Sequence, residues 1–134
     1  MFDGFKNATV QLTPRAALVA TMIYLSSADG HVEDSEIGDI LKVVPDRQAF
    51  DTAIQYTKRC GFAQFLEETS RMLSPQQKMC AILNAADLAM GDGHLAAAET
   101  AMLRQIAGAW QIPDQYLTPY VHALMAKNNI SVFG

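Results

Sequence analysis

The chain has 134 residues, of which 50% are hydrophobic and 18% charged. This length accommodates one domain with a sizeable core, and the apolar content excludes an intrinsically disordered chain. Ten lysines and arginines stand against fourteen aspartates and glutamates, for a net charge of −4. A nucleic-acid-binding protein needs a basic footprint, and no basic run occurs, so we expect no nucleic-acid partner.

The two cysteines, Cys60 and Cys80, have neither metal-ligand nor redox spacing, which argues against a disulfide scaffold. No apolar stretch approaches the roughly 20 residues that span a bilayer, and residues 1–6 do not resemble a signal peptide. We therefore expect a soluble, cytoplasmic protein with reduced thiols and no direct membrane insertion.

Helix start and stop signals divide the chain into helical segments. Thr13 and Pro14 form a start signal, because threonine can accept from the first free amides and proline fits the first helical position. Ser74 and Pro75 repeat this signal, and glycines end the segments that follow both pairs. Apolar residues recur at helical spacing in segments over 13–30, 35–44, 46–60, 62–73, 74–91, 96–110 and 114–127.

The last of these segments contains Thr118 and Pro119, and the proline predicts an interruption with a fresh helix beginning there. We expect residues 1–12 and 128–134 to be loosely attached. No run alternates apolar and polar residues as a half-buried strand does. The sequence therefore predicts an all-α, single-domain bundle of about seven helices, with the domain covering 1–134.

An acidic motif occurs twice at a fixed separation. Aspartate, glycine, histidine, an aliphatic residue and a final glutamate coincide between 29–36 and 92–99, with equivalent positions 63 residues apart. A helix start signal precedes each copy. We infer two pseudo-repeated helix-turn-helix hairpins, with repeat halves at about 13–60 and 74–112 and a C-terminal helix at about 114–127.

The motif has a structural interpretation. Gly30 and Gly93 would end a helix in the left-handed conformation, which glycine adopts without strain. Glu36 and Glu99 would reach back to cap an amide at the start of the next helix. Ala96 stands where a capping box prefers serine or threonine, which weakens this interpretation for the second copy.

The alternative is a divalent-metal site formed by Asp29, Glu36, Asp92 and Glu99. The two aspartates stand at helix C-termini, where the macrodipole disfavours an anion. All four lie in line with apolar helix faces, so we expect them to be partly buried and to need a cationic partner, yet few lysines or arginines are near. Oxygen ligands suit a hard cation, with Ca²⁺ or Mg²⁺ favoured and Mn²⁺ also suitable. The spacing is not that of an EF-hand.

His31 and His94 also occupy equivalent positions, and as ligands they would extend the set toward Zn²⁺ or another transition metal. A histidine that follows a helix-ending glycine is more often exposed, and we favour that interpretation for both. His122 is expected to fill an amphipathic position on the last helix.

The paired Ala-Asp-Gly-x₅-Glu signals, with Leu-Arg-Gln-Ile-Ala at 103–107 and Gln-Ile at 111–112, resemble the TerB family of tellurite-resistance-associated proteins. The resemblance covers roughly 13–112. It implies an all-helical bacterial protein of tellurite and stress-response systems that binds a divalent metal through the four acidic turn residues. The second turn departs from the pattern, because it reads Gly-Asp-Gly and lacks further acids, which favours one shared site or one occupied turn.

These observations predict a non-enzymatic, metal-binding stress module that docks on protein partners. A purely structural interaction module without a metal is the alternative. A metal-assisted hydrolase is least expected, because the sequence has no Ser/His/Asp ordering, no phosphate-binding glycine loop and no HExxH helix. We expect Cys60 and Cys80 to be small core or boundary residues rather than nucleophiles.

Overall fold

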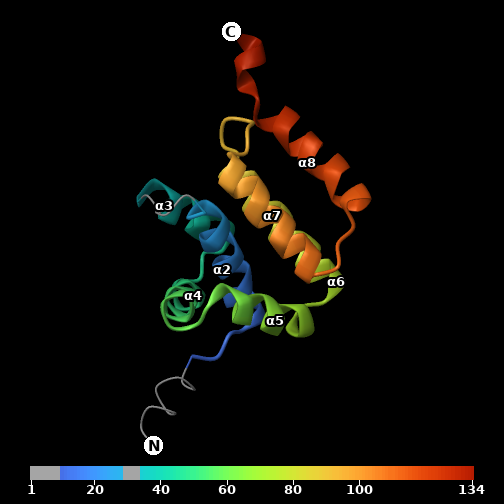
Figure 1. Ribbon diagram of the computed structural model, residues 1–134. Helices are drawn as coiled ribbons and strands as arrows, with labels where there is room; N and C mark the ends of the chain where they lie inside the picture. The colour runs from blue at the N-terminus through green and yellow to red at the C-terminus, as the bar shows by residue number, and fades with distance from the viewer. Residues whose placement is uncertain (1–9, 29–33) are drawn as a thin grey trace, which may run out of the picture.

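The computed structural model describes residues 10–28 and 34–134 of the chain (Figure 1). This part contains seven α-helices, one short 3₁₀ helix and no strand, which confirms the all-α prediction. The elements are, in chain order, α2 (Pro14–Ser26), α3 (Asp34–Val43), α4 (Arg47–Arg59), α5 (Phe62–Met72), α6 (Pro75–Ala89), α7 (Ala97–Ala109), α8 (Asp114–Asn128) and the 3₁₀ helix η1 (Ile130–Phe133).

Helix α2 is the centre of the bundle and packs mainly against α6 and α4. Both of the helices α2 and α6 carry small buried side chains, including Ala17, Ala20, Ala81 and Ala85. Small residues allow two helix axes to approach closely, so that the larger side chains on either side interdigitate. Met22 and Met90 are both fully buried, as suits a flexible apolar side chain that fills irregular gaps in a core.

The two predicted start signals are confirmed as helix caps. Thr13 Oγ1 accepts from the Ala16 amide at 3.1 Å, and Ser74 Oγ accepts from the Gln77 amide at 3.1 Å. Gln77 Oε1 in turn accepts from the Ser74 amide, which completes a reciprocal capping box.

The predicted interruption at Pro119 is wrong, because α8 continues through it as one helix. A proline inside a helix cannot donate the hydrogen bond to the carbonyl four residues earlier, here that of Gln115. Gln115 is exposed, so water can hydrate that carbonyl. Leu117 is buried on one side of the proline and Asn128 is bonded to α6 at the far end, so both halves are held in line.

The predicted loose termini are only partly confirmed. Val10 and Leu12 pack against the core, so the attached part of the chain begins before α2. Asn128 is the last residue of α8 and donates to Asp87. Beyond it, η1 is exposed and extends from the end of α8 in Figure 1. Residues 1–9 lie outside the described part of the chain.

Within the described residues, no helix combines the length and apolarity that crossing a membrane requires. The two-hairpin repeat stays a prediction, because residues 29–33, the turn of its first half, lie outside the described residues.

Candidate functional site

The second acidic turn, between α6 and α7, is held by its own carboxylates. Asp92 Oδ1 accepts from the His94 amide at 3.0 Å, a hydrogen bond that closes the loop locally. Glu99, in the first turn of α7, accepts from the Ala96 amide through Oε1 at 2.8 Å. The amide-capping role predicted for Glu99 is therefore confirmed, even though an alanine side chain cannot return the bond.

Burial distinguishes the two carboxylates of this turn. Glu99 is half-buried, as expected from its alignment with the apolar face of α7. Asp92 is exposed, so the expectation of partial burial is wrong there. The chain leaves the helical path at Met90, so the spacing that placed Asp92 on the apolar face of α6 no longer applies.

Gly93 fixes the position of this turn against α8. It has φ +89, which confirms the left-handed conformation predicted there. The predicted helix-ending role is wrong, because α6 ends at Ala89 with Met90 as its C-cap. A Cβ at this position would lie 3.1 Å from the Met125 carbonyl oxygen and 3.1 Å from Cα of Asn129. The turn therefore needs glycine for its conformation and for the close approach of the end of α8.

Asp87, in the last turn of α6, binds the same end of α8. It accepts from Lys127 Nζ at 3.0 and 3.1 Å and from Asn128 Nδ2 at 2.6 Å. This contact could not be predicted from the sequence, because no local pattern relates two residues some forty positions apart. Asp87 and Gly93 together attach the end of α8 to the second turn.

The first acidic turn is only partly described. Asp29, Gly30 and His31 lie outside the described residues, so their predicted roles stay predictions. Glu36 is half-buried in the first turn of α3. Ser26, the last residue of α2, is 5% exposed, and its Oγ has no hydrogen-bond partner among the described residues.

The donor chemistry near this first turn suits a hard cation. A buried hydroxyl without a partner lowers the stability of the fold, and a cation coordinated by its oxygen could offset that cost. The Ser26 hydroxyl and the Glu36 carboxylate are oxygen donors of the kind that Ca²⁺ and Mg²⁺ bind. Over 10–28 and 34–134, no three histidine, cysteine, aspartate or glutamate side chains come together as a metal-ligand group. A complete site would need further donors, for which Asp29 is the predicted candidate.

The histidines are placed as predicted where the structure describes them. His94 and His122 are both exposed. Both line a groove between α7 and α8 with a volume of about 320 Å³. Sequence periodicity gave no sign of this groove, because it depends on the distance between two helices.

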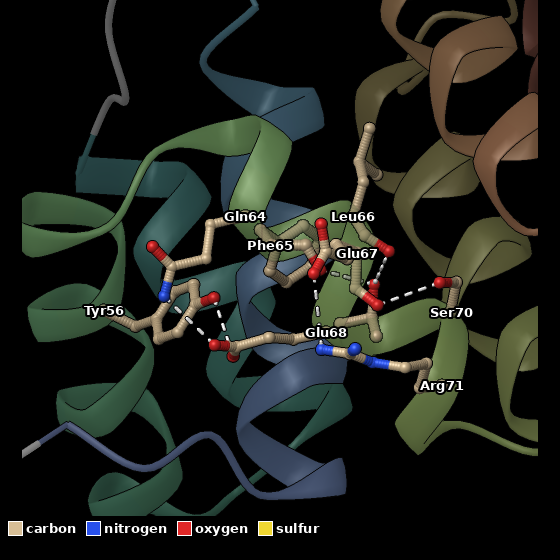
Figure 2. A network of polar contacts seen from close by, with 9 residues as sticks. Tyr56, Gln64, Phe65, Leu66, Glu67, Glu68, Ser70 and Arg71 are labelled. Carbon is tan, nitrogen blue, oxygen red and sulfur yellow. Dashed lines mark hydrogen bonds and ion pairs between the residues drawn. The ribbon is translucent and has the colours of Figure 1, made fainter. Parts of the chain in front are cut away.

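A second group of polar contacts, not predicted from the sequence, lies on α4 and α5 (Figure 2). The Tyr56 hydroxyl donates to Glu68 Oε2 at 2.8 Å, and Gln64 Nε2 donates to Oε1 of the same carboxylate at 3.0 Å. Burial, followed by the hydrogen bond to Glu68, raises the pKa of Tyr56. On the outer side of α5, Arg71 pairs with Glu67 at 3.5 Å. Only the bond between the buried Tyr56 and Glu68 joins α4 to α5, because the other two contacts lie within α5.

Tyr24 on α2 packs beside this network. Its ring lies 4.8 Å from each of the Phe62 and Phe65 rings, and its hydroxyl is buried without a partner among the described residues. Burial raises the pKa of Tyr24 to about 12. The nearby Cys60 thiol also has a raised pKa, mainly through burial, which disfavours the reactive thiolate. Cys80 is exposed, so the expected core or boundary position is wrong for that residue.

Comparison with protein families matches residues 15–118 to the family described as Tellurite resistance protein TerB. Neither the curated proteins nor the solved structures gave a significant match. The matched range begins in the first turn of α2 and ends inside α8, so it covers both acidic turns and most of the bundle. The chain therefore belongs to the TerB family.

Proposed function

We propose that this chain is a non-enzymatic, cytoplasmic TerB module of a tellurite-resistance or stress-response system. In this proposal it binds one divalent cation at its first acidic turn, through Asp29 and Glu36, and docks on a protein partner. Ca²⁺ or Mg²⁺ is the favoured cation. The second turn, with Asp92 and Glu99, has a mainly structural role in this proposal.

The difference between the two turns supports this assignment. In the second turn, Asp92 and Glu99 each bind a backbone amide, and Gly93 is packed against the end of α8. Beside the first turn, the buried Ser26 hydroxyl has no partner among the described residues. That orphaned hydroxyl is the single observation that carries the choice of turn, because buried polar groups in proteins are nearly always satisfied.

Local charge also favours a cation at the first turn. The sequence from 29 to 39 contains five acidic residues and no lysine or arginine. At the second turn the residues from 91 to 99 contain only Asp92 and Glu99 as acids. Higher ligand charge strengthens the binding of a hard divalent cation, so the first turn is the better site.

Thermal unfolding with matched variants tests the proposal. The wild type, Asp29→Ala and Asp92→Ala are melted in EDTA and in Ca²⁺, Mg²⁺, Mn²⁺ or Zn²⁺. A ligand at a hundred times its Kd stabilises the fold by about 2.7 kcal/mol, which raises Tm by several degrees. We expect one cation to raise the Tm of the wild type and of Asp92→Ala, but not that of Asp29→Ala.

The purely structural alternative is favoured by one observation, the capping bond from the Ala96 amide to Glu99. If Glu36 has only the equivalent role, no cation shifts the Tm of any variant. That result would reject the cation site and leave protein docking as the proposed function.

A further inference from the structure

The groove between α7 and α8 has an apolar floor. Its apolar lining residues are Leu95, Leu103, Leu117, Val121 and Met125. Leu103 and Leu117 are nearly buried, while α8 presents most of its other side chains to solvent. A volume of about 320 Å³ is in the range of pockets that hold compact apolar ligands.

The rim of the groove carries little net charge. Arg104 on α7 and Asp114 on α8 are its two charged residues, and they have opposite signs. A strongly acidic or basic segment would gain little there, because each charge would meet one attractive and one repulsive neighbour. The groove is suited to an uncharged apolar segment.

The chain displays such a segment at η1. Residues 128–134 contain no charged side chain. The apolar side chains of Ile130, Val132 and Phe133 are 76%, 72% and 89% exposed. Three large apolar side chains exposed together within four residues are unusual on a folded surface and indicate a contact site.

The same segment is directed away from the groove of its own molecule. Asn129 is held against Gly93, and the Asn129 amide donates to the Ala126 carbonyl at 3.4 Å. Ser131 bonds the Asn129 side chain and accepts from the Gly134 amide, which keeps η1 compact. Figure 1 shows η1 continuing beyond the loop that joins α6 to α7.

We propose that η1 inserts into the α7–α8 groove of a second copy of this chain, and that the second copy inserts its own η1 in return. A reciprocal exchange around a two-fold axis gives a closed dimer. Three such side chains expose roughly 400 Å² together. Two segments and two grooves would then bury on the order of 1,600 Å², which is the area of a standard specific interface.

Sedimentation equilibrium in EDTA, from low to several hundred micromolar protein, tests this inference independently of the cation proposal. We expect the wild type to dimerise. Phe133→Asp and the groove-rim variant Thr118→Glu should each raise the dimer Kd about tenfold to a hundredfold, because each introduces a charge into an apolar contact. Both residues are exposed, so neither change should unfold the chain. Val43→Asp, at an exposed apolar residue on α3, is the matched control and should dimerise like the wild type.

Mixing the two variants distinguishes reciprocal exchange of η1 from nonspecific association. An equimolar mixture of Phe133→Asp and Thr118→Glu retains one intact η1–groove pair, so it should associate more strongly than either variant alone. A wild type that stays monomeric throughout overturns the proposal, as does a Val43→Asp variant that is weakened as much as Phe133→Asp. A monomeric wild type whose Tm falls in Phe133→Asp would instead place η1 in its own groove.

Discussion

The indole Nε1–H of Trp110, at the end of α7, donates to Oγ1 of Thr69 on α5 at 2.8 Å. Both residues are almost completely buried. The Thr69 hydroxyl in turn donates a hydrogen bond to the Phe65 carbonyl at 2.7 Å. The indole, the hydroxyl and the carbonyl therefore form a continuous chain of hydrogen bonds. This contact joins two helices that are separated by α6 in the sequence, and it gives the only tryptophan of the chain a defined orientation.

Thr69→Val should destabilise the fold by about 1–3 kcal/mol, because it leaves a buried indole N–H without an acceptor. Thr21→Val is the matched control. Thr21 is equally buried and also bonds the carbonyl four residues earlier, at 2.7 Å, but no side chain of 10–28 or 34–134 donates to it. Urea unfolding, followed by tryptophan fluorescence, measures the free energy of unfolding of both variants. Equal losses of stability in the two variants would show that the indole bond contributes nothing.

Gly93→Ala should lower the free energy of unfolding by about 1–2 kcal/mol or more. The left-handed backbone disfavours any Cβ by this amount, and the contact with Asn129 adds to it. Gly108→Ala, inside α7 and with open space around the added methyl, should instead stabilise by about 0.5–1 kcal/mol. Thermal melts of the two variants in EDTA should move in opposite directions. A Gly93→Ala protein as stable as the wild type would mean that the turn can separate from α8 at no cost.

Tyr24→Phe should be neutral or stabilising at pH 7, because it removes a buried hydroxyl that has no partner among the described residues. Tyr56→Phe should be destabilising by about 1 kcal/mol, because it breaks the bond to Glu68. Chemical unfolding at pH 7 compares the two. A larger loss in Tyr24→Phe than in Tyr56→Phe would contradict this account of the cluster.

The pKa of Tyr24 also predicts how stability depends on alkaline pH. Its folded-state pKa is raised to about 12, from an unfolded value near 10. Between these values the unfolded chain loses the proton and the folded chain keeps it, so the free energy of unfolding falls as pH rises from about 10 to 12 and is unaffected below. Tyr24→Phe should show a shallower decline over that window. A variant with the slope of the wild type would show that Tyr24 does not contribute.

Asp87→Ala should release the end of α8 from α6. The bonds to Lys127 and Asn128 are partly exposed, so we expect a loss of about 1 kcal/mol. Hydrogen exchange should accelerate in 125–129 and in the turn at 91–95, and little elsewhere. Asp51→Ala, which breaks an exposed ion pair within α4, is the control and should leave exchange unchanged. Unchanged exchange at the end of α8 in Asp87→Ala would show that the helix is held by packing alone.

Local signals predicted the helices well, because capping and periodicity act within a few residues. Thr13 and Ser74 cap the helices that they were expected to cap, and Gly93 adopts the left-handed backbone. The interruption predicted at Pro119 is wrong for a physical reason. The cost of a proline inside a helix is set by whether its surroundings hold the two halves together, and those surroundings come from α6.

Contacts between distant residues could not be predicted from one sequence. The bonds of Asp87 to the end of α8 and of Trp110 to Thr69 join residues about forty positions apart, and nothing in their neighbours distinguishes them. The acidic motif was found, but its spacing alone could not separate amide capping from metal binding. At the second turn the capping role is confirmed for Glu99, while the metal role of both turns stays a prediction.

The most direct test of the cation site is a titration with Mn²⁺ followed by amide NMR spectra, because this paramagnetic ion broadens the signals of nearby residues. At low Mn²⁺ the account predicts early broadening at Ser26, Ser27 and Glu36, with the signals of 92–99 retained, and recovery on adding excess Ca²⁺ or Mg²⁺. Asp29→Ala should abolish the effect. Broadening that begins at the second turn, or that is absent from both turns, would contradict the assignment of the cation to the first.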